Sequence, residues 1–219
     1  MNIVMIMAGG VGNRFGAGMP KQYVKLNGKP VIDYVIEAVK KSKLTDKIVV
    51  VIDEEYINYS DELKRKDEKI DFAPNGKERY DSLRNGFELI KSKYDCENVL
   101  IADAVAPFIY PELIDDYFEK LKEYDGVITS QKITGALGNY DFDILDREKY
   151  YMTQSPEAFK FKKIYENFNP SLETQELGWH LPKGSKFYLN FEFKNNLKLT
   201  YNFELEYASS LMKHLNNNQ

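Results

Sequence analysis

The fold is decided near the N-terminus, where residues 2–22 read NIVMIMAGGVGNRFGAGMPKQ. An apolar run over residues 2–7 is typical of a strand buried on both faces. Five glycines follow between residues 9 and 18, and they let the backbone turn tightly and point N–H groups into a concavity. With Arg14 and Lys21 beside them, the segment predicts a strand followed by a loop that receives phosphate oxygens.

Similar apolar runs recur along the chain and alternate with amphipathic segments. The apolar runs are residues 47–52, 98–102 and 126–130, and the helical patterns are residues 31–41, 80–93 and 111–124. This alternation predicts right-handed crossovers and a Rossmann-like α/β fold, with a doubly wound, mostly parallel sheet. In such a fold, ligands bind at the carboxyl ends of the strands.

The pattern breaks after residue 130. Residues 131–159 are polar, aromatic and interrupted by glycine, and they are too long for a plain connection, so they predict an extended β-arm or hairpin that leaves the sheet. Beyond the arm, the patterns predict helices at 161–168 and 203–215 and a strand at 185–191. We interpret residues 1–219 as a single domain, with residues 131–155 as a protruding arm within it.

Composition limits the classes of partner. The 30 Lys and Arg residues against 34 Asp and Glu residues leave a net charge of −4, so no broad basic surface is available for nucleic acid. Cys96 is the single cysteine, and the N-terminus lacks the pattern of a signal peptide. No apolar run is long enough to span a bilayer. We therefore expect a cytoplasmic protein with neither nucleic acid nor membrane as a partner.

The glycine loop taken alone leaves two interpretations open. It is not a Walker loop, because no Gly-Lys-Ser/Thr follows, and it lacks the register of G-x-G-x-x-G. An ordinary glycine-rich turn with two solvated cations is one interpretation. A phosphate-binding loop is the other, and the PKQ segment at residues 20–22 favours it.

Several motifs together resemble one enzyme family. A-G-G-x-G-x-R-x-G followed by P-K-Q resembles the signature loop of the cytidylyltransferases that make CDP-methylerythritol and of relatives that make CDP-ribitol. Further family motifs are matched in the same order by GKERYDSLRNG (76–86), DAVAPF (103–108), DREKYYMTQSPEAF (146–159) and NNLKLT (195–200). The resemblance spans nearly the whole chain. It implies that residues 1–219 are a single nucleotidyltransferase domain, with residues 131–155 as an arm used in dimerisation.

The resemblance implies that CMP is transferred from CTP to an alcohol phosphate with release of pyrophosphate. Because this reaction joins two anions, it depends on positioning and on electrostatic stabilisation. The residues implied to act catalytically are Arg14, Lys21, Lys198 and Arg147. Those implied to bind the nucleotide are Ala8, Gly9, Gly10, Gly12, Gly76, Arg79, Ser82 and Asp103. Those implied to bind the acceptor are Ala106, Arg147, Ser155 and Lys198.

The resemblance also implies a cofactor and an assembly. Asp103 follows an apolar run, at a strand end where a carboxylate can hold Mg²⁺ against phosphates; a strand-end Asp is also a common helix or turn cap. Arg147 matches the family residue that contacts the second substrate across a homodimer interface. A solvated arm residue is the alternative for Arg147.

The acceptor side departs from the family pattern. Ala106 stands where the family has Arg, Glu157 stands where Gln is usual, and residues 169–187 lack the expected T-D-D/E-A segment. The segments AGGVG (8–12) and DAVAPF (103–108) favour the CDP-ribitol relatives. We therefore expect a ribitol 5-phosphate-like alditol phosphate as acceptor, giving a CDP-alcohol for teichoic acid or capsule. Methylerythritol phosphate, for isoprenoid synthesis, is the alternative. Two further alternatives are a non-catalytic nucleotide-binding or scaffold relative and a nucleotidyltransferase that uses another NTP.

Overall fold

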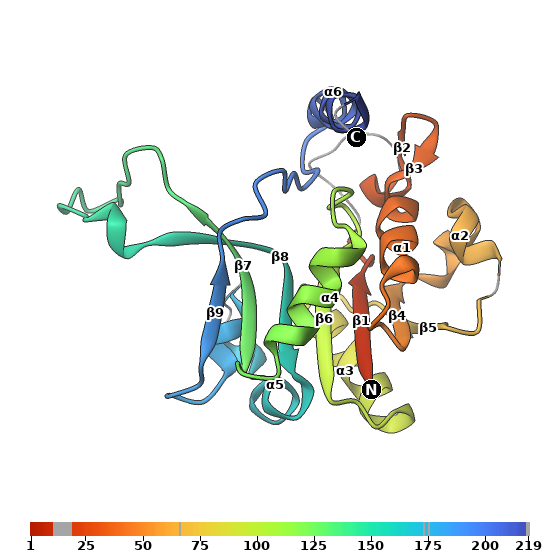
Figure 1. The fold of residues 1–219 in the computed structure, drawn as a ribbon, viewed down its shortest axis with the longest axis horizontal. Coiled ribbons are helices and arrows are strands. Elements are labelled where there is room, and N and C mark those ends of the chain that lie inside the picture. Colours follow the sequence, from red (N-terminus) through yellow and green to blue (C-terminus); the bar gives the residue numbers. More distant parts are fainter. Residues whose placement is uncertain (11–18, 66, 173, 175, 218–219) are drawn as a thin grey trace.

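A seven-stranded sheet forms the centre of the computed structural model, which describes residues 1–10, 19–65, 67–172, 174 and 176–217. The strand order is β5-β4-β1-β6-β8-β7-β9 (Figure 1). The strands are β1 Asn2–Met7, β4 Lys47–Ile52, β5 Ile70–Pro74, β6 Asn98–Asp103, β7 Gly126–Lys132, β8 Tyr151–Lys160 and β9 Phe187–Asn190. Within this sheet, β8 pairs antiparallel with β6 and β7, and the other pairings are parallel.

Helices cover both faces of the sheet. They are α1 Val31–Lys41, α2 Asp61–Lys64, α3 Arg79–Lys93, α4 Pro111–Lys120, α5 Phe161–Asn167 and α6 Glu204–Asn217. Short 3₁₀ turns occur at Lys21–Tyr23, Glu54–Tyr59, Arg147–Lys149, Pro170–Leu172 and Leu177–His180. A separate two-stranded hairpin is formed by β2 Lys25–Leu26 and β3 Lys29–Pro30. In Figure 1, α6 lies beyond the carboxyl ends of the strands.

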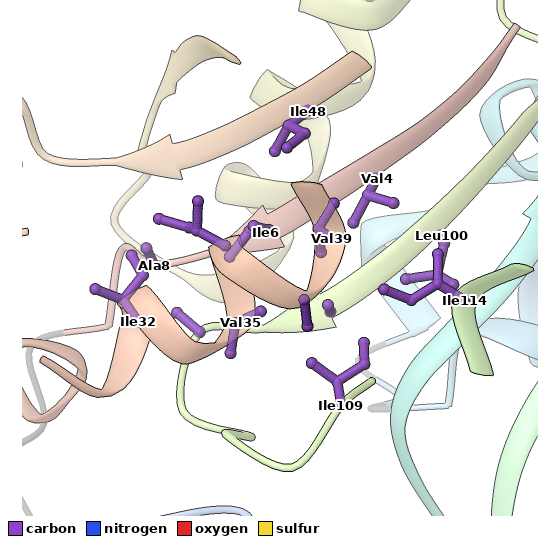
Figure 2. Close-up of a cluster of buried hydrophobic side chains, with 14 of the residues drawn as sticks. Val4, Ile6, Ala8, Ile32, Val35, Val39, Ile48, Leu100, Ile109 and Ile114 are labelled. Carbon is purple, nitrogen blue, oxygen red and sulfur yellow. The ribbon is translucent and has the colours of Figure 1, made fainter. Parts of the chain in front are cut away.

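The alternation of side chains along β1 explains the two layers. Successive strand residues point to opposite faces, so Val4 and Ile6 belong to one buried cluster together with residues of α1 and α4. Ile3 and Met5 belong to a second cluster with residues of α3 and α5. Figure 2 shows the first cluster, in which α1 residues such as Val35 lie against the sheet. The predicted doubly wound, mostly parallel sheet is confirmed.

Two strands of the seven-stranded sheet were not identified by the sequence patterns. β5 was not predicted because its sequence, IDFAP, is short, contains Asp71 and ends in Pro74 at the sheet edge. β8 was expected only as part of an arm, but it returns into the sheet between β6 and β7. Its outer half is polar and exposed, and only residues 156–159 are buried, so the strand shows no continuous apolar run.

The segment that leaves the sheet is shorter than the predicted arm, residues 131–155. Residues 131–132 belong to β7 and residues 151–155 to β8, so residues 133–150 form the projection, and we call them the arm (Figure 1). Tyr140, Phe142 and Ile144 on the arm are almost fully exposed. Among the described residues, no helix has the length and apolar character needed to cross a membrane.

Candidate active site

A carboxylate held by two cations lies at the carboxyl end of the sheet. Asp103 is the last residue of β6 and is buried. Its Oδ1 lies 3.0 Å from an Nη atom of Arg79, the first residue of α3. Its Oδ2 lies 2.6 Å from Nζ of Lys198, in the segment between β9 and α6. Residues separated widely in sequence thus meet where parallel strands end.

The charges at this point are fixed by their mutual contacts. Burial alone opposes ionisation of Asp103, but Arg79 and Lys198 outweigh it and hold the pKa of the Asp103 carboxyl well below its usual range. Asp103 in turn raises the pKa of the Arg79 guanidinium. The carboxylate therefore stays ionised and holds both cations in place without neutralising their combined charge.

Backbone contacts bring Lys198 to Asp103. The amide of Leu199 donates to the carbonyl of Val105 at 2.9 Å, which docks this segment on the loop after β6. Asn196 Nδ2 donates to the carbonyl of Ser155 at 2.6 Å, which docks it on β8. Lys198 is therefore held through neighbours on both sides.

Ser155 supports the same carboxylate from β8. The pairing of β7 with β8 passes from Ile128 opposite Glu157 to Thr129 opposite Gln154, so Ser155 lies in an irregularity of the strand. Its Oγ accepts a hydrogen bond from the backbone N–H of Asp103 at 2.8 Å. Such irregularities re-aim a side chain next to a site, and here the strand turns Ser155 toward the end of β6.

A cavity of about 490 Å³ opens on one side of the Asp103 cluster. Its lining includes several predicted nucleotide-binding residues: Gly9, Gly10, Gly76, Arg79, Ser82 and Asp103. Lys21 and Lys198 line it as well. With Lys77 and Arg79, the cavity therefore combines glycine backbone with four cationic side chains, a surface suited to a polyphosphate.

Two of the glycines are required by close packing. A Cβ on Gly76 would lie 2.2 Å from Cβ of Asp81, and a Cβ on Gly9 would lie 2.4 Å from Cβ of Asn75. The amide of Gly76 donates to Ser82 Oγ at 2.9 Å, which ties the loop to α3. Among the described residues, none lies within 4 Å of a Cβ built on Gly10.

Gln22 is a site residue that the sequence prediction omitted. Its Nε2 donates to the carbonyls of Ala8 at 2.6 Å and Gly10 at 2.9 Å, and its side chain is buried. Gln22 is the last residue of the PKQ motif at residues 20–22, so the motif could have identified it. The N–H of Ala8 donates to the carbonyl of Val51 at 2.8 Å. Ala8 does not line the cavity, so its contribution is to hold the end of β1 in place.

A smaller cavity of about 220 Å³ lies on the other side of the cluster. It shares Arg79, Asp103 and Lys198 with the larger cavity. Its remaining lining residues are Ile101, Thr153, Gln154, Ser155, Glu157 and Asn196. The cluster is thus a common wall between two spaces of different size and chemistry.

Other predicted residues are not brought to this wall. Gly12 and Arg14 lie outside the described residues. Ala106 is buried and lines neither cavity. Arg147 lies on the arm, where its guanidinium donates to the carbonyl of Thr134 at 2.8 Å and pairs with Glu148 at 3.2 Å. Within one chain, Arg147 contacts only its own arm in these interactions.

Known proteins resemble this chain over most of its length. The model of the family described as 2-C-methyl-D-erythritol 4-phosphate cytidylyltransferase (IspD) matches residues 2–214. The chain is 32% identical over 217 residues to the 2-C-methyl-D-erythritol 4-phosphate cytidylyltransferase of Caldicellulosiruptor saccharolyticus, covering 95% of this chain and 96% of the relative. It is 34% identical over 212 residues to the enzyme of the same name from Clostridium botulinum, covering 90% and 92%.

A solved structure supports the fold. The crystal structure of 4-diphosphocytidyl-2C-methyl-D-erythritol synthase from Anaerococcus prevotii superposes with a TM-score of 0.79 at 21% identity, covering 97% of this chain and 96% of that one.

These matches correct the expected acceptor. The prediction of a ribitol 5-phosphate-like acceptor for teichoic acid or capsule is wrong, because the family model and the relatives name methylerythritol phosphate instead. The departures at Ala106 and in residues 169–187 misled the prediction, since Ala106 lines neither cavity. The chain is a nucleotidyltransferase that belongs to the 2-C-methyl-D-erythritol 4-phosphate cytidylyltransferase family.

Proposed function

We propose that the protein transfers CMP from CTP to 2-C-methyl-D-erythritol 4-phosphate and releases pyrophosphate. The observation that carries this proposal is the meeting of Arg79 and Lys198 on Asp103, in the wall shared by the two cavities. A reaction between two anionic substrates needs cations at the point where the substrates meet. The names of the relatives supply the acceptor and the donor class.

The larger cavity is suited to the CTP side of the reaction. Its glycine backbone can approach phosphate oxygens closely, as bulkier residues could not. Lys21 lines the same cavity, and a cation there stabilises the charge that grows on the leaving pyrophosphate. Arg14, from the loop between Gly10 and Met19, is proposed for the same role.

Lys198 is suited to the bond-forming step. An oxygen of the acceptor phosphate attacks the α-phosphorus of CTP in line, and the oxygens on that phosphorus gain charge as the bond to pyrophosphate breaks. Lys198 faces both cavities, so its ammonium group can contact a phosphate from either substrate. The ion pair with Asp103 keeps the ammonium oriented.

Asp103 also fits a role in holding Mg²⁺. Among the described residues, no group of three or more His, Cys, Asp and Glu side chains comes together. Mg²⁺ is commonly held by one or two carboxylates, with phosphates and water completing its oxygen ligands, and a carboxylate has about four acceptor positions. Bound there, Mg²⁺ would supply charge neutralisation on the CTP phosphates, while Asp103 anchors it.

The arm is proposed to complete the acceptor site of a second copy in a homodimer. Three large apolar side chains on the arm, Tyr140, Phe142 and Ile144, are almost fully exposed, which suits burial against another protein surface. Arg147 stands at the base of the same arm. In a two-fold dimer the contact is reciprocal, so each copy gives one Arg147 to the other.

A pyrophosphate-release assay tests the activity. Purified protein, Mg²⁺ and CTP are combined with a panel of methylerythritol, erythritol, ribitol, glycerol and mannitol phosphates, and CTP is then replaced by UTP, ATP and GTP. We expect turnover only with CTP and methylerythritol 4-phosphate. Turnover with a different acceptor, or thermal stabilisation by no nucleotide at all, would reject the proposed function.

A further inference from the structure

The side-chain amide of Asn196 lines the smaller cavity and is held by two hydrogen bonds from its nitrogen. Asn196 Nδ2 donates to the carbonyl of Ser155 at 2.6 Å and to Oε1 of Gln154 at 3.1 Å. Gln154 is held in turn, because its Nε2 donates to Oε1 of Gln131 at 2.7 Å. Side-chain amides thus form a chain from β7 through β8 to the cavity.

A backbone carbonyl fixes which way the Asn196 amide points. The carbonyl of Ser155 has no hydrogen to donate, so the Asn196 atom 2.6 Å from it is the nitrogen. The same nitrogen contacts Gln154, so the contacting atom of Gln154 is its oxygen. Rotating the Asn196 amide by half a turn would place acceptor against acceptor at both contacts. The position of Asn196 Oδ1 is therefore determined.

This oxygen has no donor in the protein as described. Among the described residues, none hydrogen-bonds to Asn196 Oδ1, although the atom is buried. A buried acceptor that has lost its contact with water raises the free energy until a donor reaches it. Because Asn196 lines the smaller cavity, a molecule bound there can supply this donor.

The other groups around the smaller cavity indicate the chemistry of such a molecule. Arg79 and Lys198 supply cations at the wall shared with the larger cavity, which suits a phosphate. A phosphate ionised beside two cations has only acceptor oxygens, so it is not the donor for Asn196 Oδ1, whereas a hydroxyl group can donate. The cavity therefore suits a molecule that carries both a phosphate and hydroxyl groups.

We propose that Asn196 is a specificity-determining residue for the acceptor, whose Oδ1 accepts a hydrogen bond from a hydroxyl group of the alcohol phosphate while Arg79 and Lys198 bind the phosphate. The identity of that alcohol phosphate rests on the proposed function. The hydroxyl contact itself requires only that an alcohol phosphate enters the smaller cavity.

Removing the hydroxyl and removing the amide, separately and together, tests this contact. Methylerythritol phosphates that each lack one hydroxyl group are compared with the parent in the pyrophosphate-release assay. With the wild type, loss of the contacted hydroxyl should lower kcat/KM by about 10-fold or more, because Asn196 Oδ1 is then left buried without a donor. Asn196→Ala has no such oxygen, so the same analogue should come within about twofold of the parent.

This comparison between acceptors separates recognition from structural support. Asn196 also docks the segment that carries Lys198 on β8, so Asn196→Ala should turn over every acceptor more slowly. That structural loss is the same for the parent and for its analogues. Asn195→Ala is the matched control, because Asn195 is exposed and lines neither cavity; it should keep the discrimination of the wild type.

A binding measurement needs no turnover. The same acceptors are titrated calorimetrically in the presence of a CTP analogue with a methylene bridge between its α- and β-phosphates, which cannot release pyrophosphate. The wild type and Asn195→Ala should bind one deoxy analogue about 10-fold more weakly than the parent, and Asn196→Ala should bind the two alike.

The outcomes distinguish the inference from the proposed function. Equal losses with the wild type and Asn196→Ala overturn the inference, and so does a wild type that treats every deoxy analogue like the parent, which needs no variant to fold. Discrimination in binding that Asn196→Ala abolishes, without turnover of any acceptor, rejects the proposed function and keeps the role of Asn196. No binding of any alcohol phosphate rejects both.

Discussion

The wall around Asp103 and the arm around Arg147 are built in different ways. Asp103 is buried, and its backbone and both carboxylate oxygens contact groups from α3, β8 and the segment before α6. The Arg147 side chain is 45% exposed, and within the described part of the chain its hydrogen bonds and ion pair are with the arm residues Thr134, Gly135 and Glu148. The wall around Asp103 is thus held by contacts within a single chain, whereas the arm exposes the Arg147 guanidinium to solvent.

The difference shows where the chain can supply preorganised charge by itself. Side chains at the carboxyl ends of buried strands are held in position by the core of their own chain, so they need no second subunit to fix them. A cation on a projecting arm acquires a fixed position only when a second surface covers the arm. The two regions should therefore respond differently to substitution and to mixing of subunits.

Removing a cation that lines the cavities is expected to have the largest effect. Lys198→Ala and Lys21→Ala should each lower kcat by about 10² to 10³-fold, as is usual when a preorganised charge stabiliser is lost. Steady-state pyrophosphate release measures the change. Lys194→Ala is the control, because its side chain is 77% exposed and pairs loosely with Glu192 at 3.7 Å; turnover equal to that control would show that the wall does not act on the phosphates.

Mixing of subunits tests the arm directly. Lys21→Ala and Arg147→Ala proteins, refolded together, should form about half mixed dimers, each with one intact site if Arg147 acts in the partner. Activity should then recover to about a quarter of the wild-type value. Sedimentation shows whether the dimers form, and a monomer, or exchange without recovery, would leave Arg147 as a solvated arm residue.

Asp103→Asn tests how firmly the wall is held. Leaving two cations beside a neutral amide should lower the free energy of unfolding by about 2 to 3 kcal/mol at neutral pH. Because the folded pKa of Asp103 is depressed, its contribution is present above the unfolded pKa of about 3.9 and is lost as pH falls toward the folded value. Urea unfolding should therefore show the difference shrinking in acid.

The control for Asp103→Asn is Asp116→Asn, which removes a half-exposed ion pair with Lys120 on α4. Its effect should stay within about 0.5 kcal/mol. Equal losses in the two variants would mean that the pairs around Asp103 contribute no more than a surface pair.

The smallest effect is expected at the glycines. Gly76→Ala should lower the free energy of unfolding by about 1 to 2 kcal/mol, because its Cβ would overlap Asp81 and the loop must shift. A Cβ at Gly10 meets no described residue within 4 Å, so Gly10→Ala should change stability by less than about 0.5 kcal/mol. Thermal unfolding distinguishes them, and a larger loss at Gly10 would contradict the packing argument.

Sequence patterns predicted the part of the fold that alternates regularly. β1, β4 and β6 are continuous apolar runs, so their periodicity identified them and placed Asp103 at a strand end. β8 could not be identified in this way, because its polar outer half hides a buried end. The site residues found by resemblance were those with distinctive motifs, such as Arg79 and Lys198.

The remainder depends on contacts between distant segments. Asp103 and Ser155 belong to different motifs, and their hydrogen bond follows from the position of β8 beside β6. Gln22 was visible in a motif, but its hydrogen bonds to Ala8 and Gly10 require the folded loop. Periodicity describes one element at a time, so pairings of this kind need the tertiary structure.

The antiparallel insertion of β8 has a consequence for the order in which the protein is made. The hydrogen bond from Asp103 to Ser155 spans 52 residues of chain, and the ion pair with Lys198 closes a still longer loop. Contacts of this range form late, because the entropy of loop closure must be overcome first. A nascent chain that ends before β8 already carries Asp103 but not the strand and lysine that complete its surroundings, so catalytic competence is acquired only when the C-terminal part of the chain has been synthesised.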